Sequence, residues 1–171
     1  MRKIIIIIAI LLIASCQTNI QHKYGHALIR VHDKYIPLYD ESFNIIDSII
    51  CDIDKDLVYS IQVLEIKQNY AHINADCVFG PSDSDFIKKN GWISLNYLGV
   101  NPATHELVLR KRPSDRSQIQ SIIENAQWGD LYEVKDMYKG WVYIDVRING
   151  TQYSGWISPV QLCSNPLSPC C

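Results

Sequence analysis

The sequence predicts an all-β protein that consists of two copies of one small unit. Short segments rich in β-branched and aromatic residues alternate with polar turns over most of the chain, which is typical of a β-sandwich or barrel. No segment keeps a 3.6-residue apolar period over the length of an ordinary helix. The pattern Gly-Trp-Ile-Ser-x-x-x-Leu begins at Gly91 and again at Gly155, which indicates an internal repeat.

The N-terminal segment, residues 1–15, has the features of a signal peptide. Arg2 and Lys3 form a short basic region, and an unbroken apolar run follows from Ile4 to Ile13. This run is shorter than the about 20 residues that span a bilayer. We therefore expect this segment to direct export.

The end of this segment, Ile13-Ala14-Ser15-Cys16, resembles the bacterial lipobox. The resemblance implies that Cys16 carries a diacylglycerol and an amide-linked acyl chain such as palmitate, which together anchor a protein firmly in a membrane. The alternative is an ordinary signal peptide followed by an unrelated cysteine. Gln17 is compatible with sorting to the outer membrane, so we expect a lipid-anchored protein of the bacterial cell envelope that faces the periplasm.

Composition and motifs exclude several classes of function. The 171 residues carry a net charge of −2, which argues against nucleic acid as a partner. No nucleophile elbow, zinc-protease helix or phosphate-binding loop is present, so we expect neither an enzyme nor a cofactor. The acidic run 52–56 lacks the glycine and glutamate of a calcium loop, since Leu57 and Val63 occupy those positions. No metal site is predicted.

The cysteines are compatible with export. Besides Cys16, the chain has an odd number of them: Cys51, Cys77, Cys163, Cys170 and Cys171. A Cys51–Cys77 disulfide is possible, and Cys163 could pair with either cysteine of the tail. Small buried thiols are an equally good interpretation. Cys51 or Cys77 with His72 is the one thiol–histidine combination close in sequence that a cysteine peptidase would need.

The first unit is predicted over residues 24–101, after a polar tether at 16–23. The expected strands are 27–31, 35–39, 45–50, 57–66 and 69–73. An insertion at 77–90 contains Gly80-Pro81 followed by alternating serine and aspartate, a strong loop signal. The first Gly-Trp-Ile-Ser pattern follows.

The second unit is predicted over residues 105–163, before a cysteine-containing tail at 164–171. The expected strands are 107–110, 119–123, 131–134 and 140–144, and Asn149-Gly150 predicts a hairpin turn before the second Gly-Trp-Ile-Ser. Residues 119–123 match 46–50, and residues 140–144 match 69–73. The same landmarks in the same order favour a duplication.

Several of these landmarks give the second unit a family resemblance. Leu109-Arg110, Pro113-Ser114, Gly129, Gly140-Trp141-Val142 and the Gly155-Trp156-Ile157 segment with Leu162 are similar to a bacterial SH3-type domain. The first unit resembles this family more weakly, since Asn69-Tyr70 stands where Gly-Trp is usual. The resemblance implies two tandem SH3-like β-barrels, each with a short 3₁₀ turn, at 94–97 and 158–161. We expect the two barrels to pack together, because such small units bury limited cores alone.

Aromatic residues are the candidate ligand contacts. Gly91, Trp92, Gly155 and Trp156 are assigned to the structural repeat, with both tryptophans in the core or a groove wall. Trp128 is predicted in a turn, where a core has less need of an aromatic side chain. The candidate binding patch is Trp128, Tyr138, Trp141 and Tyr143.

Two functional hypotheses of different class follow. The first is a non-catalytic recognition module at the envelope that binds a cell-wall peptide or glycan, such as a peptidoglycan fragment, as the family resemblance implies. The second is an assembly subunit that docks another envelope protein. Exposed aromatic residues serve either function, and the oligomeric state remains open.

Overall fold

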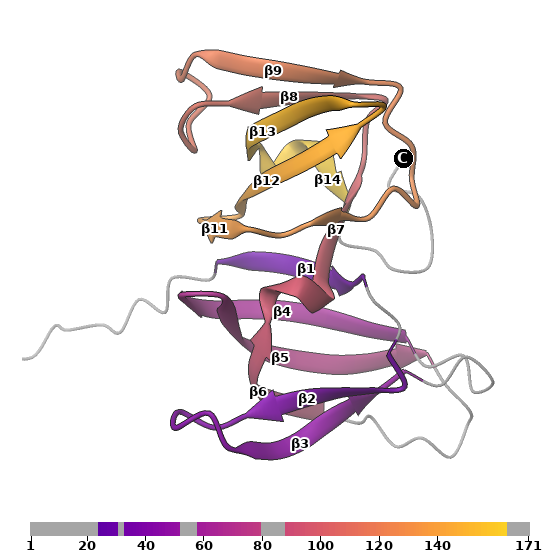
Figure 1. Ribbon diagram of the computed structural model, residues 1–171, viewed down its shortest axis with the longest axis vertical. Helices are drawn as coiled ribbons and strands as arrows, with labels where there is room; N and C mark the ends of the chain where they lie inside the picture. Colours follow the sequence, from indigo (N-terminus) through magenta and orange to yellow (C-terminus); the bar gives the residue numbers. More distant parts are fainter. Residues whose placement is uncertain (1–23, 31–32, 52–57, 80–87, 164–171) are drawn as a thin grey trace, which may run out of the picture.

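The computed structural model describes residues 24–30, 33–51, 58–79 and 88–163, so the predicted signal segment, the tether, Cys16 and the tail lie outside it. The described chain is all-β, as predicted, with two short 3₁₀ helices (Figure 1). The strands are β1 Gly25–Ile29, β2 Tyr35–Tyr39, β3 Ile45–Ile50, β4 Val58–Lys67, β5 Tyr70–Phe79, β6 Lys88–Ser94, β7 Leu98–Pro102, β8 Glu106–Arg110, β9 Ile119–Glu124, β10 Tyr132–Glu133, β11 Asp136–Tyr138, β12 Trp141–Ile148, β13 Thr151–Ile157 and β14 Leu162–Cys163. The 3₁₀ helices, η2 Leu95–Tyr97 and η3 Pro159–Gln161, lie where the sequence predicted them.

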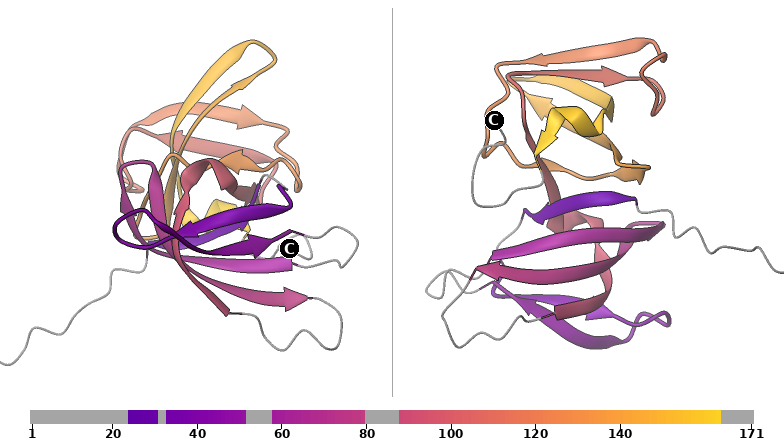
Figure 2. Two further views of the ribbon diagram at one scale, coloured as in Figure 1. Left: turned by 60° about the horizontal axis from the view of Figure 1, so that its bottom comes forward. Right: turned by 180° about the vertical axis from the view of Figure 1, so that it is seen from behind.

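The strands form two sheets. Within the described residues, the first sheet has the order β10-β7-β1-β4-β5-β6-β2-β3, with β14 also paired to β7, and the second has the order β11-β12-β13-β8-β9. Two short strands of the C-terminal half, β10 and β14, therefore belong to the sheet of the N-terminal half. β7 receives both of them and runs from one half toward the other in Figures 1 and 2.

The two Gly-Trp-Ile-Ser segments occupy equivalent positions in these ladders. Trp92 pairs with His72 on one side and with Tyr39 on the other. Trp156 pairs in the same way with Tyr143 and Arg110. The order of strands is also shared: β2, β3, β4, β5, β6, η2 and β7 correspond to β8, β9, β11, β12, β13, η3 and β14. This common order agrees with the repeat found in the sequence.

The two repeat glycines allow close crossing of strands. Gly91 and Gly155 have φ of 155° and 145°, in a region that favours glycine. A Cβ at Gly155 would lie 2.9 Å from Leu109 Cβ and 3.0 Å from the Arg110 carbonyl oxygen. A Cβ at Gly91 would lie 3.2 Å from the carbonyl oxygen of Tyr39. The backbone of each repeat segment therefore packs directly on a strand of its own half, β2 for Gly91 and β8 for Gly155.

The two halves share one hydrophobic core. A single cluster of buried side chains includes Ile61 and Ile73 from the N-terminal half and Leu107 and Ile144 from the C-terminal half. Gly25 packs against β11 and the β11–β12 turn, since a Cβ there would lie 2.9 Å from the Met137 Cε and 3.2 Å from the Gly140 Cα. The halves are thus packed together, as expected from their small size.

Candidate functional site

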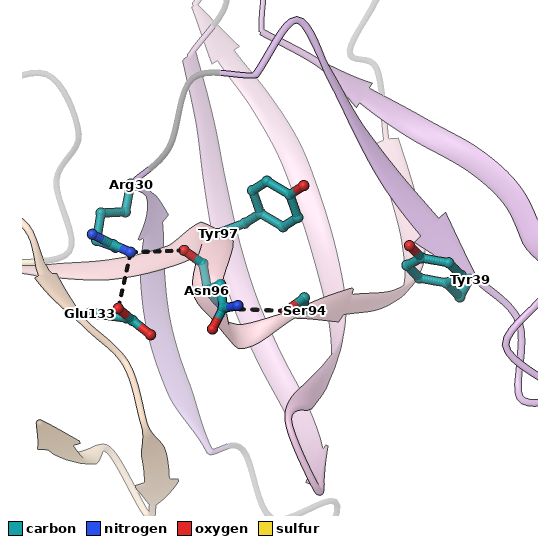
Figure 3. Close-up of a pocket in the computed structure, with 6 residues that line it drawn as sticks. All are labelled: Arg30, Tyr39, Ser94, Asn96, Tyr97 and Glu133. Atoms are coloured by element: carbon teal, nitrogen blue, oxygen red, sulfur yellow. Dashed lines mark hydrogen bonds and ion pairs between the residues drawn. The ribbon is translucent and has the colours of Figure 1, made fainter. Parts of the chain in front are cut away.

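A polar cleft lies where the two halves meet. It has a volume of about 510 Å³ and is lined by Arg30, Tyr39, Ser94, Asn96, Tyr97 and Glu133 (Figure 3). Tyr39 is the last residue of β2. Ser94 is the N-cap of η2, and Asn96 and Tyr97 belong to this helix. Glu133 comes from β10 of the other half. Figure 3 shows Tyr97 between the Arg30–Glu133 pair and Tyr39.

Arg30 organises one end of the cleft. Its Nη2 donates to Glu133 Oε2 at 3.0 Å and to the carbonyl oxygen of Asn96 at 3.2 Å. Its aliphatic stem lies over Gly99, where an added Cβ would approach Arg30 Cβ to 3.0 Å. The Nε of Arg30 is buried and makes no hydrogen bond within the described part of the chain. The cleft therefore ends in a fixed guanidinium whose hydrogen-bonding capacity is not fully used.

The η2 helix fixes the polar groups beside this guanidinium. The hydroxyl of Ser94 accepts a long hydrogen bond, 3.4 Å, from the backbone N–H of Asn96 as an N-cap. Burial raises the pKa of Tyr97, and the Asp33 carboxylate raises it further by its negative charge and by accepting a hydrogen bond from the Tyr97 hydroxyl. Tyr97 is therefore a neutral phenol at physiological pH. The cleft presents aromatic rings, hydroxyls, an amide and one charge of each sign.

A second cavity, here called the inter-half groove, lies between Tyr24 and Ile66 of one half and residues of the other. It has a volume of about 350 Å³, and its further lining residues are Pro113, Asp136, Met137, Tyr138 and Trp156. Apolar and aromatic groups dominate this lining, and Asp136 is its one carboxylate. Such a lining suits an apolar ligand that carries a cationic group.

The structure places three of the four aromatic residues of the predicted patch on the β11–β12 hairpin, where Tyr138 pairs with Trp141 across the ladder. Tyr138 is 47 % exposed and lines the inter-half groove, and Tyr143 contacts Trp156 with ring centroids 5.5 Å apart. Trp128 is exposed, but it lies in the turn before Gly129, whose N–H donates to Asn101. Trp141 is 9 % exposed and belongs to the core, so it cannot line an exposed groove together with Trp128.

The two repeat tryptophans differ in exposure. Trp92 is buried at 2 % exposure; the His72 ring stacks on it, and the Phe43 ring lies 6.5 Å away. Trp156 is half-buried and forms part of the groove wall. Both outcomes agree with the expectation of a core or groove-wall role.

The cysteines differ from one of the sequence expectations. Cys51 has a free thiol, so the Cys51–Cys77 disulfide is not formed in this structure. The two residues enter from strands that are not neighbours, since Cys77 pairs with Tyr59 in the β4–β5 ladder and Cys51 follows β3. Cys163 is buried and disulfide-bonded, while its predicted partners Cys170 and Cys171 lie outside the described residues.

The histidine considered for thiol catalysis has other contacts. The His72 ring stacks on Trp92 at 5.2 Å, and its Nε2 lies 3.2 Å from the side-chain oxygen of Asn90. Among the described residues, no group of three or more His, Cys, Asp and Glu side chains is placed to hold a metal ion. The helices described are also too short to cross a membrane.

Sequence reasoning missed Arg30, Tyr97 and Glu133 as site residues. Tyr97 had a usable signal, because an aromatic residue in a predicted 3₁₀ turn is placed at a surface. Arg30 and Glu133 had none, since each is a single charged residue between apolar neighbours and the two meet only when the halves pack. Comparisons of this chain with protein-family models, with curated proteins and with solved structures found no match.

Proposed function

We propose that this protein is a non-catalytic recognition module of a bacterial cell envelope that binds a cell-wall peptide or glycan. The proposal includes two tandem SH3-like barrels and a lipid anchor on Cys16. The repeated order of hairpin, meander, 3₁₀ helix and short strand supports the SH3-like assignment. The lipobox resemblance supports the anchor.

The polar cleft is the observation that carries this function. Its rings offer apolar faces for stacking, while Ser94, Asn96 and Arg30 offer hydrogen-bond donors and acceptors. This combination suits a ligand with alternating apolar and polar surfaces, which sugars and short peptides both have. The cleft is open, so a segment of a long polymer can enter from the side.

Sedimentation with purified peptidoglycan tests the proposal. We use the chain from Gln17 onward, which retains every described residue. The unmodified chain is expected to pellet with peptidoglycan, and Tyr97→Ala combined with Asn96→Ala is expected to reduce the bound fraction about tenfold, the loss of two or three modest contacts. Failure of the unmodified chain to co-sediment at low and at moderate salt would contradict the proposal.

Val160→Ala is the matched control. Val160 is 82 % exposed and occupies in η3 the position that Asn96 occupies in η2, so its substitution should leave sedimentation unchanged. Trp128→Ala tests the sequence-based candidate. If Trp128→Ala loses binding while the variant with Tyr97→Ala and Asn96→Ala binds fully, the ligand site is the turn before Gly129 and not the polar cleft.

A second function, docking of another envelope protein, is favoured by the exposed edge of the first sheet. β3 is the last strand of that sheet, and Ile45, Ile46 and Ile50 are 68, 56 and 37 % exposed. Exposed apolar edge strands are surfaces to which other chains add. Crosslinking in envelope fractions should then give one specific adduct that Ile46→Lys abolishes, and an unchanged adduct pattern would count against this function.

A further inference from the structure

The inter-half groove contains a carboxylate and an indole whose equivalents in the N-terminal half bind a lysine side chain. Glu65, His72 and Trp92 are cross-strand neighbours in one row of the first sheet. Asp136, Tyr143 and Trp156 form the equivalent row of the second sheet. Side chains in such a row point to the same face, so each row places a carboxylate and an indole on one surface.

In the N-terminal half, this surface binds an ammonium group. Lys67, two residues after Glu65 and on the same face, places its Nζ 4.7 Å from the centre of the Trp92 ring. The same Nζ lies 3.3 Å from Glu65 Oε1. A carboxylate and the face of an indole together attract a cation by charge and by the ring quadrupole.

In the C-terminal half, the residue at the position of Lys67 is a tyrosine. Lys67 pairs with Tyr70 across the ladder, and Tyr138 pairs in the same way with Trp141. Asp136, Trp156 and Tyr138 all line the inter-half groove, so the carboxylate and the two rings face one cavity. The chain thus keeps the acceptor of this contact and replaces its donor with another aromatic ring.

Among the described residues, neither nearby cation of the second half forms an ion pair with Asp136. The guanidinium of Arg110, next to Trp156 in the ladder, donates to the carbonyl oxygen of Ser117 at 2.7 Å. The Nζ of Lys139 lies 5.3 Å from the centre of the Tyr138 ring. Asp136 accepts a hydrogen bond from the Met137 N–H, which leaves carboxylate lone pairs for a further donor.

Access also differs between the halves. In the first half, the Phe43 ring lies 4.8 Å from Tyr70 and 6.5 Å from Trp92, and Trp92 is 2 % exposed. In the second half, Trp156 is half-buried and opens onto a cavity of about 350 Å³. The first site is therefore filled by the chain's own Lys67 and its indole is covered, whereas the second site is open.

We propose that the inter-half groove binds the primary ammonium of a lysine-like side chain in a peptide ligand. The ammonium lies between Asp136 and the Trp156 ring, in the place that Lys67 occupies in the other half. The aliphatic stem packs against Met137 and Ile66, which line the same cavity. This site is separate from the polar cleft and does not depend on the function proposed for it.

Two small probes test the proposal by NMR titration of the chain from Gln17 onward. Nα-acetyl-lysine methylamide carries the ammonium, and Nα-acetyl-norleucine methylamide has a similar stem without it. The lysine probe should shift the indole N–H signal of Trp156 and bind at least about fivefold more tightly than the norleucine probe, the effect expected for one exposed cation–aromatic contact with a carboxylate.

Matched variants locate the site. Asp136→Asn should weaken the lysine probe about fivefold or more, and Tyr138→Lys should abolish its binding because the new side chain fills the site as Lys67 does. Glu65→Gln, the equivalent change in the site that Lys67 already fills, should have no effect. Tyr138 is 47 % exposed, so Tyr138→Lys is compatible with folding, which signal dispersion in the same spectra verifies.

Three results would overturn the proposal: equal affinities of the two probes, no binding of the lysine probe over the millimolar range, or equal losses in Glu65→Gln and Asp136→Asn. Peptidoglycan sedimentation of Tyr138→Lys separates this site from the cleft. If the cleft alone binds the polymer, Tyr138→Lys sediments normally while it fails to bind the lysine probe.

Discussion

Arg30 and Glu133 form an ion pair at 3.0 Å that joins the two halves of the molecule. Arg30 follows β1, and Glu133 lies on β10, which pairs with β7 in the sheet of the first half. Both side chains are less than one-third exposed, at 29 and 25 %. The pair therefore closes one end of the polar cleft and links the residues that the two halves contribute to its lining.

This pair should contribute measurably to stability. A double-mutant cycle with Arg30→Met and Glu133→Gln is expected to give a coupling energy of about 1–2 kcal/mol in urea unfolding, since the pair is charge-assisted and partly buried. The Lys67–Glu65 pair, with side chains 51 and 43 % exposed, is the control and should couple by less than about 1 kcal/mol. Equal coupling energies for the two pairs would contradict the assignment.

Substitution of the repeat glycine Gly155 should destabilise the protein more than substitution of the turn glycine Gly129. Gly155→Ala is expected to cost about 2–4 kcal/mol, because overpacking against Leu109 adds to backbone strain. Gly129 also has a positive φ, 101°, but a Cβ there would meet no atom within 4 Å. Gly129→Ala should therefore cost only about 1–2 kcal/mol. Urea unfolding measures both, and a larger loss at Gly129 would refute the crossing argument.

Replacement of Phe43 by alanine should destabilise the protein more than its replacement by glycine. Its φ of 60° is unfavourable for a bulky residue, yet its ring contacts Tyr70. Phe43→Ala removes the ring contact and keeps the backbone strain, so we expect a loss of about 1–2 kcal/mol. Phe43→Gly relieves the strain and should lose less. Both variants should also shift the fluorescence of Trp92 to longer wavelength by admitting water, and unchanged emission would show that Phe43 does not cover it.

Deprotonation of Tyr59 should make the protein less stable at high pH. Burial raises its pKa from 10.0 to about 12, with smaller contributions from the Cys77 and Cys51 thiols. Because the folded protein holds this proton more tightly than the unfolded chain, the stabilisation is complete below pH about 10 and is lost as the pH rises to about 12.

Unfolding in urea at several pH values checks this dependence. The difference in unfolding free energy between the unmodified chain and Tyr59→Phe should decrease over that interval, because only the unmodified chain has Tyr59. Burial also raises the pKa values of Tyr97 and Tyr132, but both chains contain these residues, so their effects cancel in the difference. A constant difference across the interval would mean that Tyr59 has an ordinary pKa.

The four tryptophans should differ in quenching by iodide. Trp128 is 42 % exposed, Trp156 is half-buried, and Trp141 and Trp92 are 9 and 2 % exposed. Trp128→Phe should therefore remove the largest quenchable component of the fluorescence, and Trp92→Phe the smallest. A large quenchable component from Trp141 would restore it as an exposed candidate.

Much of the local structure could be predicted from the chain. The Asn149-Gly150 turn forms as expected, with φ of 49° and 83°, because few other dipeptides adopt this geometry at low cost. The two 3₁₀ helices and the equivalent places of Trp92 and Trp156 also followed from the repeat. These features depend on neighbours in the chain or on a pattern that recurs, and both are visible in a sequence.

The candidate site was predictable only in part. Tyr138 was expected at a surface and lies there, but Trp141, its partner across the β11–β12 ladder, is buried. An aromatic residue at the start of a strand has the same local pattern whether a second unit covers it or not. Exposure is a property of the packed molecule.

The all-β class, the internal repeat and the residues that recur in it can be read from the chain alone, because strand periodicity and turn chemistry act over a few residues. Which surfaces remain open depends on tertiary packing. This packing brought Arg30 to Glu133, buried Trp141, and left Asp136 and Trp156 facing a cavity where the other half places Lys67. These outcomes depend on how two similar units pack, and residues that meet across that interface have no spacing in the chain that predicts their contact.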